Sequence, residues 1–158
     1  MSKVVLPEGY SISTDWALFD LEVIHDFLSQ TYWSKKIPKP LVERMMKNSL
    51  CFGIYHHKSQ VGFARIISDL STFAYLADVF VLPEHRGKGL SKALVATILA
   101  HPELQGLRRW MLITLDAQGL YDQFGFKPIA HAERHMEIHR SGLYEQAAAL
   151  AETIVPRS

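Results

Sequence analysis

The segment Leu76-Ala-Asp-Val-Phe-Val-Leu-Pro-Glu-His-Arg-Gly-Lys-Gly-Leu-Ser-Lys-Ala-Leu-Val-Ala96 joins an apolar run to an amphipathic run through a basic turn that contains two glycines. The first run is typical of a buried strand and the second has helical spacing. The first N–H groups of a helix have no partner within it and carry partial positive charge. Arg86 and Lys88 add formal charge at the same place. The pattern therefore predicts that the turn from Arg86 to Ser91 binds a phosphate-bearing ligand.

On both sides of this segment the sequence alternates between strand and helix patterns. A strand is expected at 10–15, helices at 19–28 and 41–48, a hairpin at 49–55 and 60–67, and a strand at 72–82. A helix at 89–100, a strand at 109–115 with residues 110–113 buried on both faces, a short helix at 119–124 and a last strand at 134–139 follow. This order predicts an α/β fold around a mixed sheet. We expect one domain, 1–142, and an appended helical tail, 143–158.

The composition is that of a globular protein, with 158 residues, 48% hydrophobic and 21% charged. Because 17 Lys and Arg nearly balance 16 Asp and Glu, we expect a local anion site and no general affinity for nucleic acid. Cys51 is the only cysteine, so an internal disulfide is excluded and an inert core thiol is expected. No signal peptide or membrane-spanning run is apparent, which predicts a cytoplasmic protein without membrane association.

Two motifs together resemble the GNAT superfamily of acetyltransferases. The first is residues 81–94, which is similar to the acetyl-CoA-binding segment of that family, with pattern Gln/Arg-x-x-Gly-x-Gly/Ala. Arg86 and Gly89 match, and Ser91 replaces the last small residue. The resemblance implies that backbone N–H groups of the turn bind the pyrophosphate and that the preceding strand binds the pantetheine arm. The implied cofactor-binding residues are Val79, Phe80, Val81, Arg86, Gly87, Lys88, Gly89, Leu90 and Ser91.

The second motif is Tyr121-x-x-x-Gly125-Phe126, which has the spacing and chain order found in the family. By this resemblance Tyr121 is the general acid that protonates the departing CoA thiolate. The resemblance covers residues 10–139. It implies the GNAT fold, with a mixed sheet of about six or seven strands, about four helices, and acetyl-CoA in the cleft between two splayed parallel strands ending near Leu82 and Leu115.

The general base is less well specified by the sequence. Asp78 is the only carboxylate in the strand at 73–82, and a carboxylate in an apolar setting suits base chemistry. However, if Tyr75 faces the acceptor in a regular strand, Asp78 faces the other way. Asp78 is therefore a tentative base or a structural partner of the backbone or Arg65. Tyr75 and His25 are further candidates.

Aromatic side chains are candidates for the acceptor site. Tyr32 and Trp33 either wall a pocket for an amine or a peptide-like acceptor or simply pack in the core, and Tyr75 is a further tentative acceptor-binding residue. His131, His135 and His139 are four residues apart, but in a loop and strand this spacing separates them by about 13 Å, so no metal site is expected.

These observations predict an acetyl-CoA-dependent N-acetyltransferase that acts on a primary amine of a small molecule or peptide by direct attack, without a metal. One alternative is a non-catalytic CoA-sensing or partner-binding module on the same fold. Another is a nucleic-acid-binding domain, which the balanced charge disfavours. The helix-prone segment 143–154 could mediate a homodimer. The sequence leaves the identity of the acceptor amine open.

Overall fold

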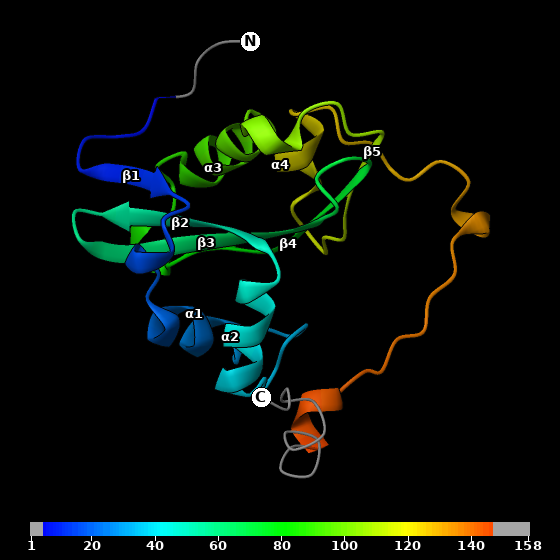
Figure 1. Ribbon diagram of the computed structural model, residues 1–158, viewed down its shortest axis with the longest axis horizontal. Helices are drawn as coiled ribbons and strands as arrows, with labels where there is room; N and C mark the ends of the chain where they lie inside the picture. Colours follow the sequence, from blue (N-terminus) through cyan, green and yellow to red (C-terminus); the bar gives the residue numbers. More distant parts are fainter. Residues whose placement is uncertain (1–4, 147–158) are drawn as a thin grey trace.

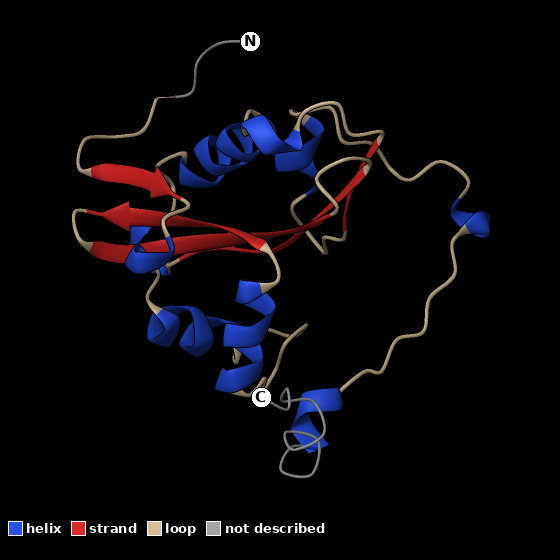
Figure 2. Cartoon of the chain, in the orientation of Figure 1, coloured by secondary structure: helices blue, strands red, loops and turns tan. Residues whose placement is uncertain are grey.

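A single mixed sheet organises the computed structural model, which describes residues 5–146 (Figure 1; Figure 2). The strand order is β1-β2-β3-β4-β5. Neighbouring strands are antiparallel from β1 to β4, whereas β5 is parallel to β4. The strands are β1 (Tyr10–Ser13), β2 (Leu50–His56), β3 (Ser59–Ser68), β4 (Phe73–Val81) and β5 (Arg109–Leu112).

Helices cover both faces of this sheet (Figure 1). On one face, α1 (Leu21–Leu28) and α2 (Lys39–Lys47) enclose a core with Phe63 and Phe80, here called the α1/α2-side core. On the other face, α3 (Leu90–Leu99) and α4 (Gln118–Asp122) enclose the α3-side core, which contains Leu76, Val81 and Tyr121. The four helices and the mixed sheet confirm the predicted α/β class. None of the helices in the described range 5–146 is long and apolar enough to cross a bilayer.

A β-bulge interrupts β4 at Asp78. The register pairs Arg65 with Ala77 and Phe63 with Phe80, so β4 has one extra residue in this interval. Asp78 has φ +56°, a left-handed conformation that Asp adopts more readily than most residues. Leu76 and Val81 both pack in the α3-side core despite their odd spacing. The bulge therefore reverses the alternation along β4. Side chains after the bulge face the opposite helix layer from the one that regular alternation would give.

The parallel strands β4 and β5 separate at the same point. Their pairing runs from Phe73 with Arg109 to Leu76 with Leu112, and β4 then continues alone to Val81. Along this last part of β4, the backbone edge that faces β5 has no strand partner within residues 5–146. The structure thus opens the sheet at the C-terminal end of β4, directly before the basic turn.

Two expectations from the sequence are corrected here, and a third falls mostly outside the described residues. The described residues form five strands rather than six or seven, because residues 134–139 are not a strand; Ala132–Arg134 is a short 3-10 helix and the rest is irregular and exposed. Residues 110–113 are not buried on both faces, since β5 is the edge strand and Ile113 is exposed. Of the expected tail helix at 143–158, the structure describes only Leu143–Gln146, which form a 3-10 helix, and residues 147–158 lie outside the described range.

Candidate functional site

At the turn between β4 and α3, the first N–H groups of α3 have no backbone partner among residues 5–146. Gly87 (φ +77°) and Gly89 (φ +76°) both adopt the left-handed conformation, which favours glycine. Gly89 is the N-cap of α3 and provides no side-chain cap. A Cβ atom built on either glycine would meet no atom within 4 Å, so the space in front of the turn is open. This arrangement suits an anionic group that accepts hydrogen bonds from the turn.

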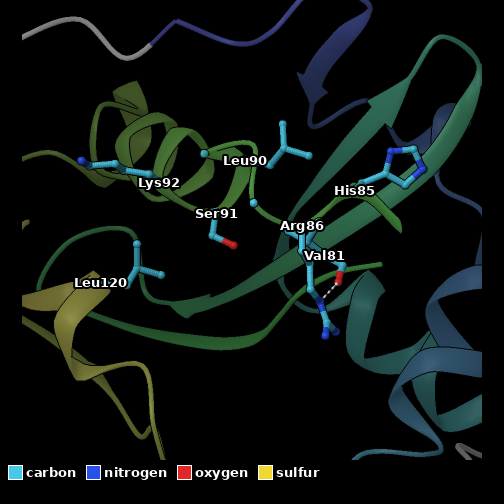
Figure 3. A pocket seen from close by; sticks show the side chains of 9 residues that line it. Val81, His85, Arg86, Leu90, Ser91, Lys92 and Leu120 are labelled. Atoms are coloured by element: carbon cyan, nitrogen blue, oxygen red, sulfur yellow. Dashed lines mark hydrogen bonds between the residues drawn. The ribbon is translucent and has the colours of Figure 1, made fainter. Parts of the chain in front are cut away.

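A shallow hollow of about 200 Å³ lies at this turn (Figure 3). Cationic side chains and apolar side chains both contribute to its wall. Arg86 Nε donates a hydrogen bond to the carbonyl oxygen of Val81 at 2.9 Å, which fixes the guanidinium against the end of β4. Leu120 of α4 lies on the opposite side, so α4 borders the same hollow. The lining residues are Val81, His85, Arg86, Gly87, Gly89, Leu90, Ser91, Lys92 and Leu120.

Tyr121 directly follows the hollow-lining Leu120. Its side chain is buried in the α3-side core, with its ring edge-to-face on Phe126 at 5.8 Å between centroids. Gly125 between them has φ +93° and lets the chain turn back after α4. Burial raises the pKa of Tyr121 above its usual value. The phenol therefore holds its proton at neutral pH, as a proton donor must before the reaction.

Asp78 lies on the opposite face of the sheet, and both of its carboxylate oxygens accept hydrogen bonds. Its Oδ2 accepts a hydrogen bond from Arg65 Nε at 2.8 Å, and its Oδ1 accepts one from Trp33 Nε1 at 2.9 Å. Arg65 Nη1 in turn donates to Ser49 Oγ at 3.2 Å. The side chains of Arg65 and Asp78 are 14% and 5% exposed. The expectation that Asp78 points away from the face of Tyr75 is wrong, because the bulge turns it to the α1/α2 side.

The aromatic candidates surround this ion pair. Tyr32 and Trp33, in the loop after α1, are 67% and 45% exposed and contact each other edge-to-face at 5.0 Å. Tyr75 of β4 is close enough to Asp78 for the carboxylate charge to affect the pKa of its phenol. Burial first, and then the Asp78 charge, raise the pKa of Tyr75. The structure therefore brings Tyr32, Trp33, Tyr75 and Asp78 together, and the exposure of the first two argues against simple core packing.

Other candidates have structural partners. The His25 ring nitrogen Nε2 is 2.9 Å from the carbonyl oxygen of Ile37 and ties α1 to the following loop. Cys51 is buried, and burial raises the pKa of its thiol to about 12. Such a thiol stays protonated and is a poor nucleophile. Across residues 5–146, no three His, Cys, Asp or Glu side chains gather in a way that could hold a metal ion.

The family model for the acetyltransferase (GNAT) domain matches residues 47–128, which include the basic turn and Tyr121. The chain belongs to the GNAT acetyltransferase family. A Gibberella zeae protein assigned by name as an acetyltransferase is 34% identical over 135 residues, covering 71% of this chain and 75% of the relative. These matches identify the protein as an acyltransferase.

Solved structures agree with this assignment. A Xanthomonas campestris pv. campestris structure attributed to the GNAT family shares 54% sequence identity at a TM-score of 0.85, covering 89% of this chain and 99% of that one. A GNAT family acetyltransferase from Elizabethkingia anophelis, solved with acetyl-CoA bound, has a TM-score of 0.61 at 12% identity over 78% of this chain and 80% of that one. At this low identity the second comparison shows the fold alone.

This GNAT acetyltransferase also has a cluster of histidines that the sequence did not predict. The ring of His56 stacks on Tyr10 at 4.5 Å and lies 5.3 Å from the ring of His85. The Tyr10 hydroxyl is 2.7 Å from Nδ1 of His85, a residue that lines the hollow. The pair His56-His57 at the hairpin turn is visible in the sequence. Its contact with His85 depends on the register of β1 and β2 and on the turn after β4.

Proposed function

We propose that this protein transfers the acetyl group of acetyl-CoA to a primary amine of a small molecule or peptide. The observation that carries the proposal is the open glycine turn at the N-terminus of α3, placed where β4 and β5 separate. The GNAT family uses acetyl-CoA, and the Elizabethkingia anophelis structure contains it.

The residues at the turn fit the cosubstrate in charge and in space. Backbone N–H groups from Arg86 to Ser91 would hold the pyrophosphate, with Arg86 and Lys88 supplying positive charge. The edge of Val79, Phe80 and Val81 that has no strand partner among residues 5–146 would pair with the amide groups of the pantetheine arm, beside the Val81 carbonyl oxygen that accepts from Arg86. Without a Cβ at Gly87 and Gly89, the anion can approach the backbone closely.

Acetyl-CoA supplies an activated thioester, so that orientation by the protein can provide much of the rate enhancement. A backbone N–H near Val79 to Val81 would polarise the thioester carbonyl while the neutral amine attacks it. The new carbon–nitrogen bond forms as the carbon–sulfur bond breaks. The buried Tyr121 phenol would then donate its proton to the departing sulfur.

The acceptor would enter from the α1/α2 side of the sheet. Tyr32 and Trp33 are exposed there, and aromatic rings attract ammonium groups. Asp78 is the candidate base for the amine proton, acting directly or through water. Its hydrogen bonds to Trp33 and Arg65 also support a positioning role, in which Asp78 fixes the Trp33 ring at the acceptor site.

A turnover screen would test this function. Purified protein is incubated with acetyl-CoA and one amine class at a time, namely polyamines, amino acids, aminoglycosides, peptides with a free N-terminus and peptides with an internal lysine. Release of free CoA thiol is recorded. At least one class should release CoA faster than the amine-free control. Tight CoA binding without turnover on any amine would instead favour a CoA-sensing module, and failure to bind CoA would contradict both.

A further inference from the structure

The loop between α1 and α2, residues 29–38, carries two exposed aromatic side chains, Tyr32 and Trp33. Hydrogen bonds within the loop and to α1 hold it in place. They join Ser34 N to Thr31 Oγ1 at 3.2 Å, Lys36 N to the carbonyl oxygen of Ser29 at 2.8 Å, and the His25 ring to the carbonyl oxygen of Ile37 at 2.9 Å. Adjacent exposed rings on a loop that is fixed in this way are typical of a surface that receives a ligand.

The Trp33 ring is oriented by the buried ion pair of β3 and β4. Its Nε1 donates to Asp78 Oδ1 at 2.9 Å, and Asp78 Oδ2 accepts from Arg65 Nε at 2.8 Å. Because the nitrogen edge of the indole is turned toward the protein, Trp33 offers carbon atoms of its ring to a ligand. Asp78 directly precedes Val79, where the proposed backbone site for the thioester begins. The Trp33 ring therefore lies beside the place where the amine would react.

The carboxylates next to these rings already have cationic partners. Asp78 is paired with Arg65, and on the loop itself Lys35 Nζ lies 3.5 Å from Glu145 Oε1. A second ammonium group on an acceptor gains affinity mainly from a carboxylate that has no other counter-charge, and neither of these two carboxylates meets that condition. Contact between a cation and a solvent-exposed ring is weak by comparison with the same contact in a dry site. The surface therefore favours a flat apolar group over a polycation.

We propose that the acceptor is a monoamine whose amino group is joined by a short linker to an aromatic ring, and that Trp33 is the residue that selects it. This inference rests on the proposed acetyl transfer and names the substrate class of the same site. The substrate ring packs on Trp33, and Tyr32, whose ring lies 5.0 Å and 82° from that of Trp33, bounds a second side. Tyr75 of β4 bounds the side nearest the sheet.

Three amines of different character test the substrate class. Phenethylamine carries an aromatic ring, cyclohexylethylamine has a saturated ring of similar size, and putrescine has two charges and no ring. In the wild-type protein, kcat/KM for phenethylamine should exceed that for each of the others by at least about 10-fold. Trp33→Leu should remove at least about 10-fold of kcat/KM for phenethylamine. Trp16→Leu is the matched control, because Trp16 is 50% exposed against 45% for Trp33 and lies in a separate 3-10 helix, and it should keep the wild-type value.

A binding measurement distinguishes failure of this inference from failure of the proposed function. Calorimetric titration of phenethylamine into protein loaded with free CoA detects the acceptor without turnover. If none of the amines releases CoA, the acetyl transfer is contradicted, and the titration alone decides the inference: binding should be at least about 10-fold weaker in Trp33→Leu than in Trp16→Leu. Preference for putrescine, equal use of the two ring-bearing amines, equal effects of the two Trp variants, or no binding of phenethylamine would each overturn the inference.

Discussion

At the scale of single residues, the direction of the Asp78 side chain depends on one backbone torsion. The left-handed conformation at Asp78 creates the bulge and turns the carboxylate toward Arg65 and Trp33. The sequence identifies Asp78 as the lone carboxylate of an apolar strand, which is the signal that singles it out. Strict alternation predicts the wrong face, because a bulge is a local departure from the two-residue period.

Removing one partner of the Asp78–Arg65 pair should destabilise the protein strongly. Asp78→Ala leaves the guanidinium of Arg65 buried without its counter-charge, and we expect a loss of about 3–5 kcal/mol in the free energy of unfolding. Urea denaturation provides the measurement. The control is Asp122→Ala, which removes an exposed ion pair with Lys127 and should cost less than about 1 kcal/mol. Equal losses in the two variants would show that the Asp78 pair is not an integrated part of the core.

Tyr121 should matter for turnover and not for cosubstrate binding. Tyr121→Phe keeps the ring in the α3-side core and removes only the proton donor, so kcat should fall by about 10²–10⁴-fold with an unchanged Kd for acetyl-CoA. Tyr55→Phe is the matched control, since Tyr55 is also buried and its hydroxyl has no hydrogen-bond partner within the described residues. That control should retain full turnover. Unchanged kcat in Tyr121→Phe would remove Tyr121 from the acid role.

At the scale of elements, sequence patterns predict those helices, strands and turns that local interactions determine. The helix at 90–99, the strand before it and the glycine turn between them follow from spacing, charge and backbone conformation, and all three are present. The predicted strand at 134–139 is absent from the sheet, although its alternation is clear. A strand requires a neighbour, and whether one is available is a property of the whole assembly rather than of the segment.

The burial of β5 likewise depends on its place in the sheet and not only on its own sequence pattern. An apolar run such as residues 110–113 favours burial on both faces, as in a central parallel strand. In the structure the run lies at the edge of the sheet, so burial is incomplete. The turn from Arg86 to Ser91 could be predicted because its chemistry is contiguous in the sequence. The contact of Asp78 with Trp33 could not, because it joins residues that are 45 positions apart.

At the scale of the whole molecule, the histidine cluster makes stability depend on pH. Burial, followed by the positive charges of His57, His85 and Lys88, lowers the pKa of His56 below the ordinary value of 6.5. The ring of Tyr10 stacks on the ring of His56. The folded protein therefore binds this proton less readily than the unfolded chain does. The contribution of His56 to stability is complete above pH 6.5 and decreases as the pH falls through the lowered pKa.

His56→Gln should reduce this loss. We expect the decrease in Tm between about pH 7 and about pH 5 to be smaller in the variant than in the wild-type protein. Thermal unfolding followed by circular dichroism at both pH values is the measurement. His139→Gln, at an exposed position outside this cluster, should leave the decrease in Tm as it is in the wild type. A steeper decrease in Tm in His56→Gln than in the wild-type protein would contradict the proposed effect of His56.

Binding of acetyl-CoA at the glycine turn is the central claim, and two glycines of equal conformation allow a direct test. Gly89 (φ +76°) and Gly106 (φ +74°) are both left-handed, and a Cβ at either position meets no atom within 4 Å. A side chain therefore causes similar backbone strain at both positions, of about 1–2 kcal/mol. Only Gly89 belongs to the turn that would hold the pyrophosphate.

The decisive measurement is calorimetric titration of acetyl-CoA into wild-type protein, Gly89→Glu and Gly106→Glu, with folding checked by circular dichroism. We predict that wild type and Gly106→Glu bind with similar affinity. In Gly89→Glu the carboxylate repels the pyrophosphate, and affinity should fall by at least about 100-fold in a folded protein. Normal acetyl-CoA affinity in folded Gly89→Glu would contradict the assignment of this turn.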